Sequence, residues 1–533
     1  MRVLGIEGTA WAASAAIVDA LSTVHTLETD AYAPESGGIH PREAAEHMAA
    51  TLPGVIATVL ETVDPATIDA IAFSRGPGLG PCLRTVATAA RTLAQELSVP
   101  LVGVNHMVAH FEVGRLRSGF SDPICLNASG ANAHVLGHTG DRYRILGETM
   151  DTGVGNAIDK FTRHLGWSHP GGPKVEQRAT DGEFVELPYI VKGMDFSFSG
   201  ITTAAMDAVD EGVPVEDVCF GLQETIFAML AEVAERALSL TGRDELVLGG
   251  GVGQNRRLQE MLSTMCTERD ASFFVPEDRL LRDNAAMIAM VGALMAEAGE
   301  TIAVADSAIR ADFRPDEVSV VWRESRNPIR INAPAALRGA EATVTIVDDE
   351  VTKTRVPRDY RHPILDSRLR RERTAAEARL LSQARRVGVP TPVVRDIDPV
   401  AATLVLERVG SADLRDALTT GRMATLGSHL ATLHDAGIVH GDPTVRNVRV
   451  APDSDRLYLI DFGLGYHSGH VEDRAMDLHV AGGSLAGTST DPHPFVESLE
   501  SGYRTTGETC SFPVDSVLDR LYDIQGRGRY QSG

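Results

Sequence analysis

Residues 246–255 read LVLGGGVGQN, an apolar run that ends in a glycine-rich turn. A short apolar run bounded by glycine is typical of a buried strand followed by a turn. Glycine after a strand lets backbone N–H groups approach a phosphate or a ribose closely. Two further glycine turns follow strand-like runs, at Gly5–Thr9 and at Ser129–Asn132. The three turns together indicate an α/β unit that binds a nucleotide.

Strand-like runs and helical stretches alternate along the first part of the chain. Val86–Leu97 and Ile226–Leu240 are rich in Ala and Leu and are typical of helices. Such alternation favours an α/β fold. Further along, strand-like runs at Ala342–Val347 and Thr403–Glu407 flank one basic helical stretch, and mainly helical sequence follows. This second order predicts a small α+β domain.

A segment with three prolines separates the two regions. Residues 314–336 show no helical periodicity, which is typical of a linker between independently folded parts. The net charge also changes, from −19 before residue 337 to −4 after it. In this chain of 533 residues we predict a first domain over residues 1–324, a linker over 325–336 and a second domain over 337–533.

The composition excludes several classes of protein. No apolar run reaches the roughly 18 residues of a membrane helix, and the N-terminus lacks the basic and apolar regions of a signal peptide. The five cysteines include no C-x-x-C pair, which argues against a disulfide framework and a zinc ribbon. We expect a cytoplasmic protein without membrane contact. A net charge of −23 with only four lysines further suggests a high-salt cytoplasm.

Two histidines and an aspartate are candidate metal ligands. His106 and His110 are one helical turn apart, so a helix would present both imidazoles on one face. An isolated pair at this spacing is more often two packing histidines, and a metal site needs a third ligand. Asp283, at the start of a helical stretch, could supply a carboxylate oxygen. The three would form a two-histidine, one-carboxylate set with positions open to substrate.

Eight motifs follow one another along the first domain. They are GIEGTAW (5–11), HPREAAEH (40–47), RGPGLG (75–80), NHMVAH (105–110), GNAIDK (155–160), HPGGP (169–173), FSFSG (196–200) and DNAAMIA (283–289). In sequence and order they resemble the universal tRNA N6-adenosine threonylcarbamoyltransferases. The resemblance implies a duplicated actin-like fold of the sugar-kinase type. It also implies transfer of a threonylcarbamoyl group from threonylcarbamoyl-adenylate to N6 of the tRNA adenosine 3′ of the anticodon.

The resemblance assigns roles to individual residues. His106, His110 and Asp283 would hold Fe²⁺ or another divalent metal. Asn127 stands where the family commonly has a tyrosine that is a further ligand, so its own role as a ligand is doubtful. Ala131 replaces a family glycine and restricts the backbone of the turn. Threonylcarbamoyl-adenylate would be bound by Asn127, Ala128, Ser129, Gly130, Ala131, Asp159, Gly172, Glu176 and Asn255.

The second domain carries the residues of phosphoryl transfer in the order found in kinases. Lys353 follows a strand-like run, Glu377 lies in a helical stretch, Asp442 precedes Asn447 by five residues, and Asp461 opens a DFG triplet. Lys353 would orient ATP and pair with Glu377, Asp442 would accept the substrate proton, and Asn447 and Asp461 would hold Mg²⁺. The glycine-rich loop is reduced to a short stretch that begins at Gly339.

Together with the motif RVPRDYRHP (355–363), this set resembles the small atypical serine/threonine kinase of the KEOPS complex. In that family the kinase acts largely as an ATPase that supports the transferase. Fusion of the two parts in this order is similar to an archaeal bifunctional protein. The resemblance implies tRNA, threonylcarbamoyl-adenylate, ATP with Mg²⁺ and other KEOPS subunits as partners.

A basic segment in the second domain suggests a tRNA contact. Eleven basic and four acidic residues occur between Lys353 and Arg386. A solvated helix face is the usual interpretation of a charge run, but it would alternate acids with bases. Clustered arginines beside a nucleotide site suit a tRNA backbone, as do Arg527 and Arg529 near the C-terminus.

Three other functions share parts of this pattern. A zinc protease needs H-E-x-x-H, and Met107 follows His106, so that chemistry fails. A serine/threonine kinase acting on proteins, fused to a nucleotide-binding scaffold without transferase activity, remains open on sequence alone. A binding scaffold with an inactive kinase part also remains open.

Overall fold

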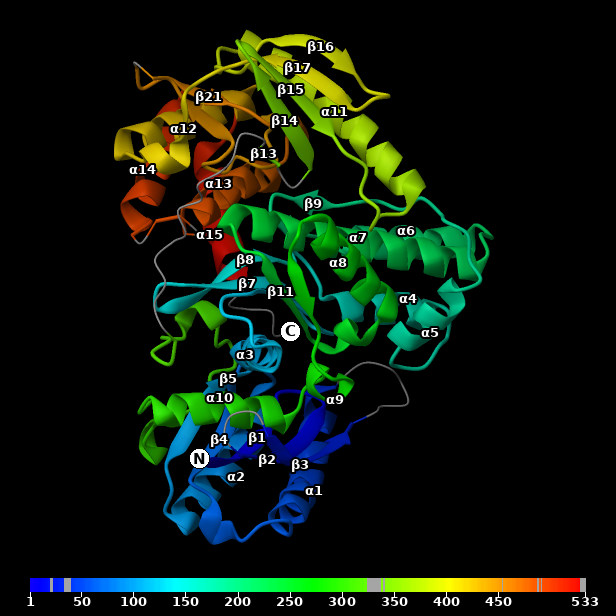
Figure 1. Cartoon of the computed structure of the whole chain (residues 1–533), viewed down its shortest axis with the longest axis vertical. Coiled ribbons are helices and arrows are strands. Elements are labelled where there is room, and N and C mark those ends of the chain that lie inside the picture. Colours follow the sequence, from blue (N-terminus) through cyan, green and yellow to red (C-terminus); the bar gives the residue numbers. More distant parts are fainter. Residues whose placement is uncertain are drawn as a thin grey trace.

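The computed structural model describes residues 1–19, 23–32, 40–323, 337–338, 341–452, 454–486, 488–489 and 491–527. Figure 1 shows the parts stacked along the long axis, with the N-terminal lobe (blue) at one end and a second lobe (cyan to green) in the middle. The C-terminal part (yellow to orange) lies at the other end. The predicted linker 325–336 and Gly339 lie outside the described residues.

A mixed five-stranded sheet forms the first lobe, in the order β3-β2-β1-β4-β5. β1 pairs antiparallel with β2 and parallel with β4. Helices α1 and α2 pack on one face and α10 on the other, so the central strands are buried and apolar. The elements are β1 (Arg2–Glu7), β2 (Ala12–Asp19), β3 (Thr23–Ala31), β4 (Ala70–Gly76), β5 (Leu101–Asn105), α1 (Pro41–Leu60), α2 (Gly80–Leu97) and α10 (Ala285–Glu297).

The second lobe repeats this sheet. Its order is β12-β11-β6-β7-β8, and β6 pairs antiparallel with β7 and parallel with β11. The repeat confirms the predicted duplicated α/β fold of the first domain. The elements are β6 (Ile124–Ala128), β7 (Ala133–Thr139), β8 (Arg142–Glu148), β9 (Val191–Lys192), β10 (Asp195–Phe196), β11 (Glu245–Gly249), β12 (Ser272–Phe274), α3 (His106–Ser118), α4 (Val154–His164), α5 (Gly172–Ala179), α6 (Ser199–Asp210), α7 (Val215–Thr241), α8 (Arg256–Glu268) and α9 (Asp278–Leu281).

The C-terminal part is α+β. An antiparallel sheet in the order β13-β14-β15-β17-β16 packs against α11, and mainly helices follow. The elements are β13 (Leu337–Arg338), β14 (Ala342–Val347), β15 (Glu350–Arg355), β16 (Val394–Asp398), β17 (Thr403–Glu407), β18 (Ala412–Asp413), β19 (Ile438–Val439), β20 (Val448–Val450), β21 (Leu457–Leu459), β22 (Tyr466–His467), α11 (Pro363–Arg386), α12 (Thr420–Asp435), α13 (Val471–Ala486), α14 (His493–Gly507) and α15 (Val514–Arg527).

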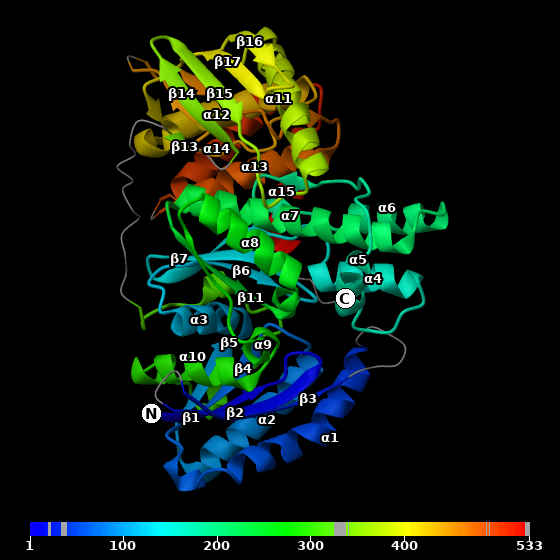
Figure 2. The same ribbon diagram turned by 45° about the vertical axis from the view of Figure 1, so that its right-hand side comes forward.

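Helix α7 lies between the second sheet and the C-terminal part in both views (Figures 1 and 2). It has 27 residues, and nearly all of them from Val218 to Leu238 are buried. Burial on all sides is typical of a helix inside a large protein. Ala228 on α7 packs with Leu365 and Leu369 of α11. The two parts therefore share apolar contacts as well as a chain.

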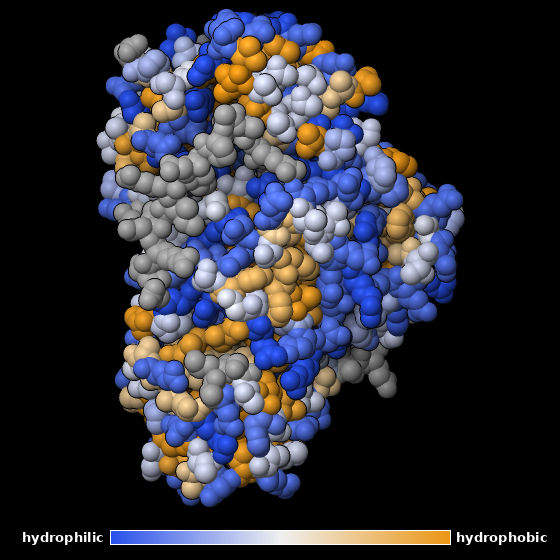
Figure 3. Space-filling view, in the orientation of Figure 1, coloured by the Kyte–Doolittle hydropathy of each residue, from blue (hydrophilic) through white to orange (hydrophobic). Residues whose placement is uncertain are grey.

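The surface is mostly hydrophilic on the face seen in the space-filling view. Hydrophilic residues cover most of the face shown in Figure 3, with apolar patches near its middle and at both ends. Among the helices of the described ranges, none combines the length and the apolar character needed to span a bilayer.

Candidate functional site

The three predicted metal ligands meet between the two lobes. His106 is the first residue of α3, whose N-terminus is capped by the Asn105 side chain, which accepts from Met107 N at 2.9 Å. His110 lies one turn later. Asp283 precedes α10, and its Oδ1 is 3.3 Å from Nε2 of each histidine. One ligand atom from each of the three lies within 4.8 Å of the others.

The charges of this cluster are strongly coupled. Burial lowers the pKa of His106, but the carboxylates of Glu7 and Asp283 outweigh it and raise that pKa to about 10. Burial raises the pKa of Asp283, and the two histidines outweigh burial and lower it. Burial lowers the pKa of His110. The carboxylates of Glu7 and Asp283 thus favour positive charge at the histidine pair.

Two residues that the sequence analysis left without a role hold the ligands in place. Glu7 is buried, and its Oε2 lies 3.2 Å from Nδ1 of His106. Trp11 donates its indole N–H to Oδ2 of Asp283 at 2.9 Å. Such outer partners fix the orientation of a metal ligand. Both belong to the GIEGTAW motif, which was the available signal in the sequence.

Asn127 lies beside this cluster at the end of β6. It is fully buried, and its Nδ2 is 3.8 Å from the sulfur of Met107. Its Oδ1 has no hydrogen-bond partner within the described part of the chain. A Cβ built on Gly249 would lie 3.3 Å from that Oδ1 and 3.6 Å from Cβ of His110. The amide oxygen therefore lies on the side of the cluster that His110 occupies.

The residues present fit a divalent ion. Two imidazoles and a carboxylate converge, and Nδ1 of His110 and Oδ1 of Asn127 are buried without a partner among the described residues. This donor set suits iron, zinc or a similar ion.

The turn after β6 packs against the start of α4. Ser129 O accepts from Gly155 N at 3.1 Å, and Gly130 O accepts from Asn156 N at 2.9 Å. A Cβ on Gly153 would lie 2.3 Å from the carbonyl carbon of Ala131, so this approach requires glycine. Ala128 is the last residue of β6 and is buried. The predicted phosphate-facing turn is thus held rigidly.

The other predicted adenylate contacts line the neighbouring helices. Asp159 on α4 accepts from Gly171 N at 2.7 Å, next to Gly172, which begins α5. Glu176 on α5 accepts from Arg256 N at 2.8 Å, and Arg256 follows Asn255. The structure therefore joins α4 to the start of α5, and α5 to the start of α8.

Asn255 is held at both ends of its amide. Its oxygen caps α8, and its Nδ2 donates to Gln223 of α7 at 3.0 Å. The side chain is therefore fixed between α7 and α8.

The five described residues predicted to handle ATP are also brought together. Lys353 Nζ on β15 lies 3.0 Å from Glu377 Oε1 on α11 and 2.7 Å from Asp461 Oδ1. Asn447 Nδ2 donates to Asp442 Oδ2 at 2.9 Å. Asp461 has a φ of 62°, a left-handed conformation that is rare outside glycine and common at functional sites.

Burial is the main cause that raises the pKa of Asp442 to about 6. Burial also raises the pKa of Asp461, but Lys353 and Arg355 outweigh it and hold that pKa below its usual value. Asp461 is therefore ionised and suited to bind a cation.

The structure changes the prediction that the basic segment, residues 353–386, presents its cations to tRNA. Five of its eleven cations are buried, and most of these pair with acids rather than face solvent: Lys353, Arg355, Arg358, Arg361 and Arg373. Three of the five pair with Glu232 or Glu235 of α7. These two acids lie outside the segment, so the charge count of the segment did not include them. Four arginines are exposed and remain candidates for a tRNA contact: Arg371, Arg379, Arg385 and Arg386. Arg529 lies outside the described residues, and the Arg527 side chain is not described.

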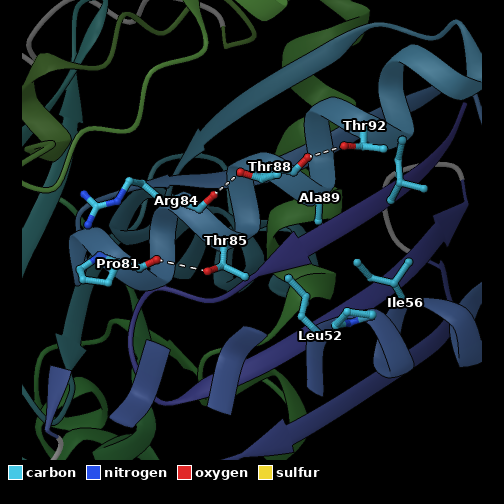
Figure 4. Close-up of a pocket in the computed structure, with 10 residues that line it drawn as sticks. Leu52, Ile56, Pro81, Arg84, Thr85, Thr88, Ala89 and Thr92 are labelled. Carbon is cyan, nitrogen blue, oxygen red and sulfur yellow. Dashed lines mark hydrogen bonds between the residues drawn. The ribbon is translucent and has the colours of Figure 1, made fainter. Parts of the chain in front are cut away.

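An apolar groove of about 720 Å³ lies elsewhere, between α1 and α2 of the first lobe (Figure 4). Leu52 and Ile56 line it from α1, and Arg84 and Thr88 from α2. None of the predicted site residues lines it, so it is separate from both clusters.

Comparison with known proteins gives a consistent picture. Residues 22–290 match the family model described as tRNA N6-adenosine threonylcarbamoyltransferase. A protein of Halobacterium salinarum named "Probable bifunctional tRNA threonylcarbamoyladenosine biosynthesis protein" is 65% identical over 100% of this chain and 99% of its own length. Proteins of the same name from Haloarcula marismortui and Methanospirillum hungatei are 63% identical over 100% of both chains and 50% identical over 99% of both.

Proposed function

Because this chain belongs to the family of tRNA N6-adenosine threonylcarbamoyltransferases and matches its bifunctional members end to end, we propose that residues 1–324 transfer the threonylcarbamoyl group from threonylcarbamoyl-adenylate to N6 of the tRNA adenosine 3′ of the anticodon. The reaction would take place within a KEOPS-type complex. The observation that carries the proposal is the convergence of His106, His110 and Asp283 between the lobes, beside a rigid glycine turn.

In this reaction the N6 amine forms a bond to the carbamoyl carbon, the bond from that carbon to the AMP phosphate oxygen breaks, and N6 loses one proton. His106, His110 and Asp283, with Asn127 as a further candidate ligand, would hold a divalent metal, which would supply Lewis-acid stabilisation of the developing oxyanion. Glu7 and Trp11 orient the ligands.

The adenylate is held by residues from several elements. Ser129, Gly130 and Ala131, with Asn127 and Ala128 before them, form the turn that faces the acyl-phosphate. Asp159, Gly172, Glu176 and Asn255 hold the adenosine and ribose. This assignment is supported by the hydrogen bonds of Asp159, Glu176 and Asn255, which bring the N-terminal ends of α5 and α8 close to α4 and α5.

We infer that residues 337–533 bind ATP with Mg²⁺ and act as an atypical serine/threonine kinase or ATPase that supports the transferase. Lys353 paired with Glu377 would orient the phosphates, and Asn447 and Asp461 would hold Mg²⁺. Asp442 would accept the proton of the attacking hydroxyl. Gly339 is proposed as a contact of the reduced glycine-rich loop.

The test is reconstitution of the full chain with tRNA, threonylcarbamoyl-adenylate, Fe²⁺ or another divalent metal, and partner subunits, with mass spectrometry of the modified nucleoside. His106→Ala combined with His110→Ala should abolish the product. Asp442→Asn should abolish ATP hydrolysis and, because that activity supports the transferase, should reduce the product without abolishing it. No product with any metal would refute the transferase. It would leave the alternative, a protein serine/threonine kinase fused to a nucleotide-binding scaffold.

A further inference from the structure

Arg282 lies between the two lobes, directly before the candidate metal ligand Asp283 in the chain. It follows the last residue of α9, and α10 begins at Ala285. Both helices lie between the sheet of the first lobe and β11 of the second (Figures 1 and 2). Asn284 holds the chain here, because its Nδ2 donates to Arg282 O at 2.7 Å. The backbone of Arg282 is therefore fixed beside the candidate metal ligands.

The side chain of Arg282 contacts a residue from each lobe. Its Nε donates to Oε1 of Gln254, in the glycine-rich turn after β11, at 2.9 Å. A Cβ built on Gly251 of the same turn would lie 3.6 Å from Cγ of Arg282. On the other side, the guanidinium carbon lies 6.0 Å from the centre of the Trp11 ring, the indole that donates to Asp283. Arg282 and Asp283 thus contact the same indole.

Trp11 does not serve the hydrophobic core. It is half-buried, and it belongs to none of the hydrophobic clusters that the described residues form. Its contacts are instead polar or charged, namely Asp283 at its N–H and Arg282 at the outer limit of a cation–π contact. The indole therefore keeps this arginine close to the cluster of His106, His110 and Asp283.

The positive charge of Arg282 has no acidic partner within the described ranges. Its one hydrogen bond there goes to an amide oxygen and uses Nε, which leaves both terminal amino groups of the guanidinium unused. The side chain is exposed, although the chain carries a net charge of −23 and has many acids to offer. A guanidinium offers donors only, in a planar fork that matches the two oxygens of a carboxylate.

The proposed donor substrate carries one charged group that no residue above accounts for. The contacts assigned so far cover its carbamoyl carbonyl, its phosphate, its ribose and its adenosine. The carboxylate of the threonyl group is left over. Three bonds separate the carbamoyl carbon from the carboxyl carbon, a span of about 4 Å at full extension. A carbamoyl group that reacts beside Asp283 therefore keeps its carboxylate close to the same cluster.

We propose that Arg282 binds the carboxylate of the threonyl group and so selects a carbamoyl donor that carries an amino acid with a free carboxylate. The two terminal amino groups of the guanidinium donate to the two carboxylate oxygens, while Gln254 and Trp11 orient the fork. The inference rests on the proposed transferase function, and it adds a specificity-determining residue to that site.

The experiment measures binding and turnover of two donors by the full chain. One donor carries the threonyl carboxylate, and the other carries a primary amide in its place. Calorimetry uses stable analogues of both, in which a sulfamate replaces the labile acyl-phosphate. Turnover uses both adenylates with tRNA, a divalent metal and the partner subunits. The wild type should prefer the acid about 10- to 100-fold in both measurements, because a charge-assisted pair is lost in the amide.

Arg282→Met should bind the acid about 10- to 100-fold more weakly and the amide about as well as the wild type, so its preference disappears. Arg282→Lys keeps the charge without the fork and should retain part of the preference. Arg279→Met is the matched control, because Arg279 is also exposed, on α9, three residues earlier. It should keep the full preference. If Arg282→Met does not fold, Arg282→Gln replaces it.

Three outcomes would overturn the inference. The preference for the acid could persist in Arg282→Met, or both analogues could lose affinity equally, which would make Arg282 a support for Trp11. Weaker tRNA binding in filter assays, with the preference intact, would instead make Arg282 a contact to a tRNA phosphate. In all three cases the wild type still forms the modified nucleoside. No product from the wild type with either donor and any metal would refute the proposed function, and this inference with it.

Discussion

Replacement of Glu232 by Gln should uncouple the two domains. The Glu232 carboxylate is buried on α7 and accepts from Tyr189 OH at 2.6 Å, Arg361 Nη2 at 2.7 Å and Arg373 Nη2 at 3.1 Å. Burial raises its pKa, but the surrounding arginines, Arg236 among them, outweigh burial and lower it, so the group is ionised. Glutamine would leave three buried guanidinium groups without this counter-charge.

The expected cost is about 3–5 kcal/mol in the free energy of unfolding, because removal of one partner strands the other charges in the interior. Glu216→Gln on the same helix is the control. Glu216 pairs with Arg178 at 2.8 Å, but the two side chains are 35% and 56% exposed. An exposed pair of this kind contributes about 0–1 kcal/mol.

The assay is urea unfolding followed by two signals. All three tryptophans, at positions 11, 167 and 322, belong to the first domain, so fluorescence reports on that domain, whereas far-UV circular dichroism reports on both. The two transitions should coincide in the wild type and in Glu216→Gln, and separate in Glu232→Gln. Coincident transitions in Glu232→Gln, or a cost within about 1 kcal/mol of the control, would refute the reasoning.

Three other changes have defined outcomes. Glu7→Gln should lower metal affinity about 10- to 100-fold in a chelator-buffered titration, because His106 loses its orienting carboxylate; unchanged affinity would argue against that role. Arg371→Ala should reduce the salt dependence of tRNA binding by about one phosphate contact, whereas Arg358→Ala should not, and equal slopes would contradict this. Burial and the charge of Glu148 raise the pKa of Asp195 to about 8, so the folded chain loses stability as the pH rises from about 4 towards 8. Asp195→Asn should remove this loss, about 1 kcal/mol per pH unit, in thermal unfolding at several pH values.

The sequence predicted best those features that depend on residues close together along the chain. Glycine turns after strands predicted an α/β unit, and the spacing of His106 and His110 predicted one helical face. The duplication of that unit came from the resemblance of the motifs to a known family. The outer partners of the candidate metal ligands were not predicted because they depend on how the lobes close. Glu7 is 99 residues from His106, and Trp11 is 272 residues from Asp283.

In the basic segment, distant contacts made a sequence prediction too broad. Counting charges between Lys353 and Arg386 gave an excess of cations and so suggested a nucleic-acid surface. Arg361 pairs with Asp366 inside the segment at 3.6 Å, but its shorter contact, at 2.7 Å, is with Glu232, 129 residues away on α7. A local charge count includes only neighbours along the chain. The structure therefore divides one apparent patch into an interior ion-pair network and a few exposed arginines.

Helix α7 contacts a residue of each of the two candidate sites. At Gln223 it holds Asn255, a proposed adenylate contact, and at Arg236 it faces Asp442, the proposed base. Thirteen helical residues separate these contacts, a rise of about 20 Å along a continuous helix. A shift of α7 along its axis would strain both contacts at once and would have to break the buried ion pairs of Glu232. The buried ion pairs of Glu232 lie on the helix between the two contacts and hold this part of α7 in place.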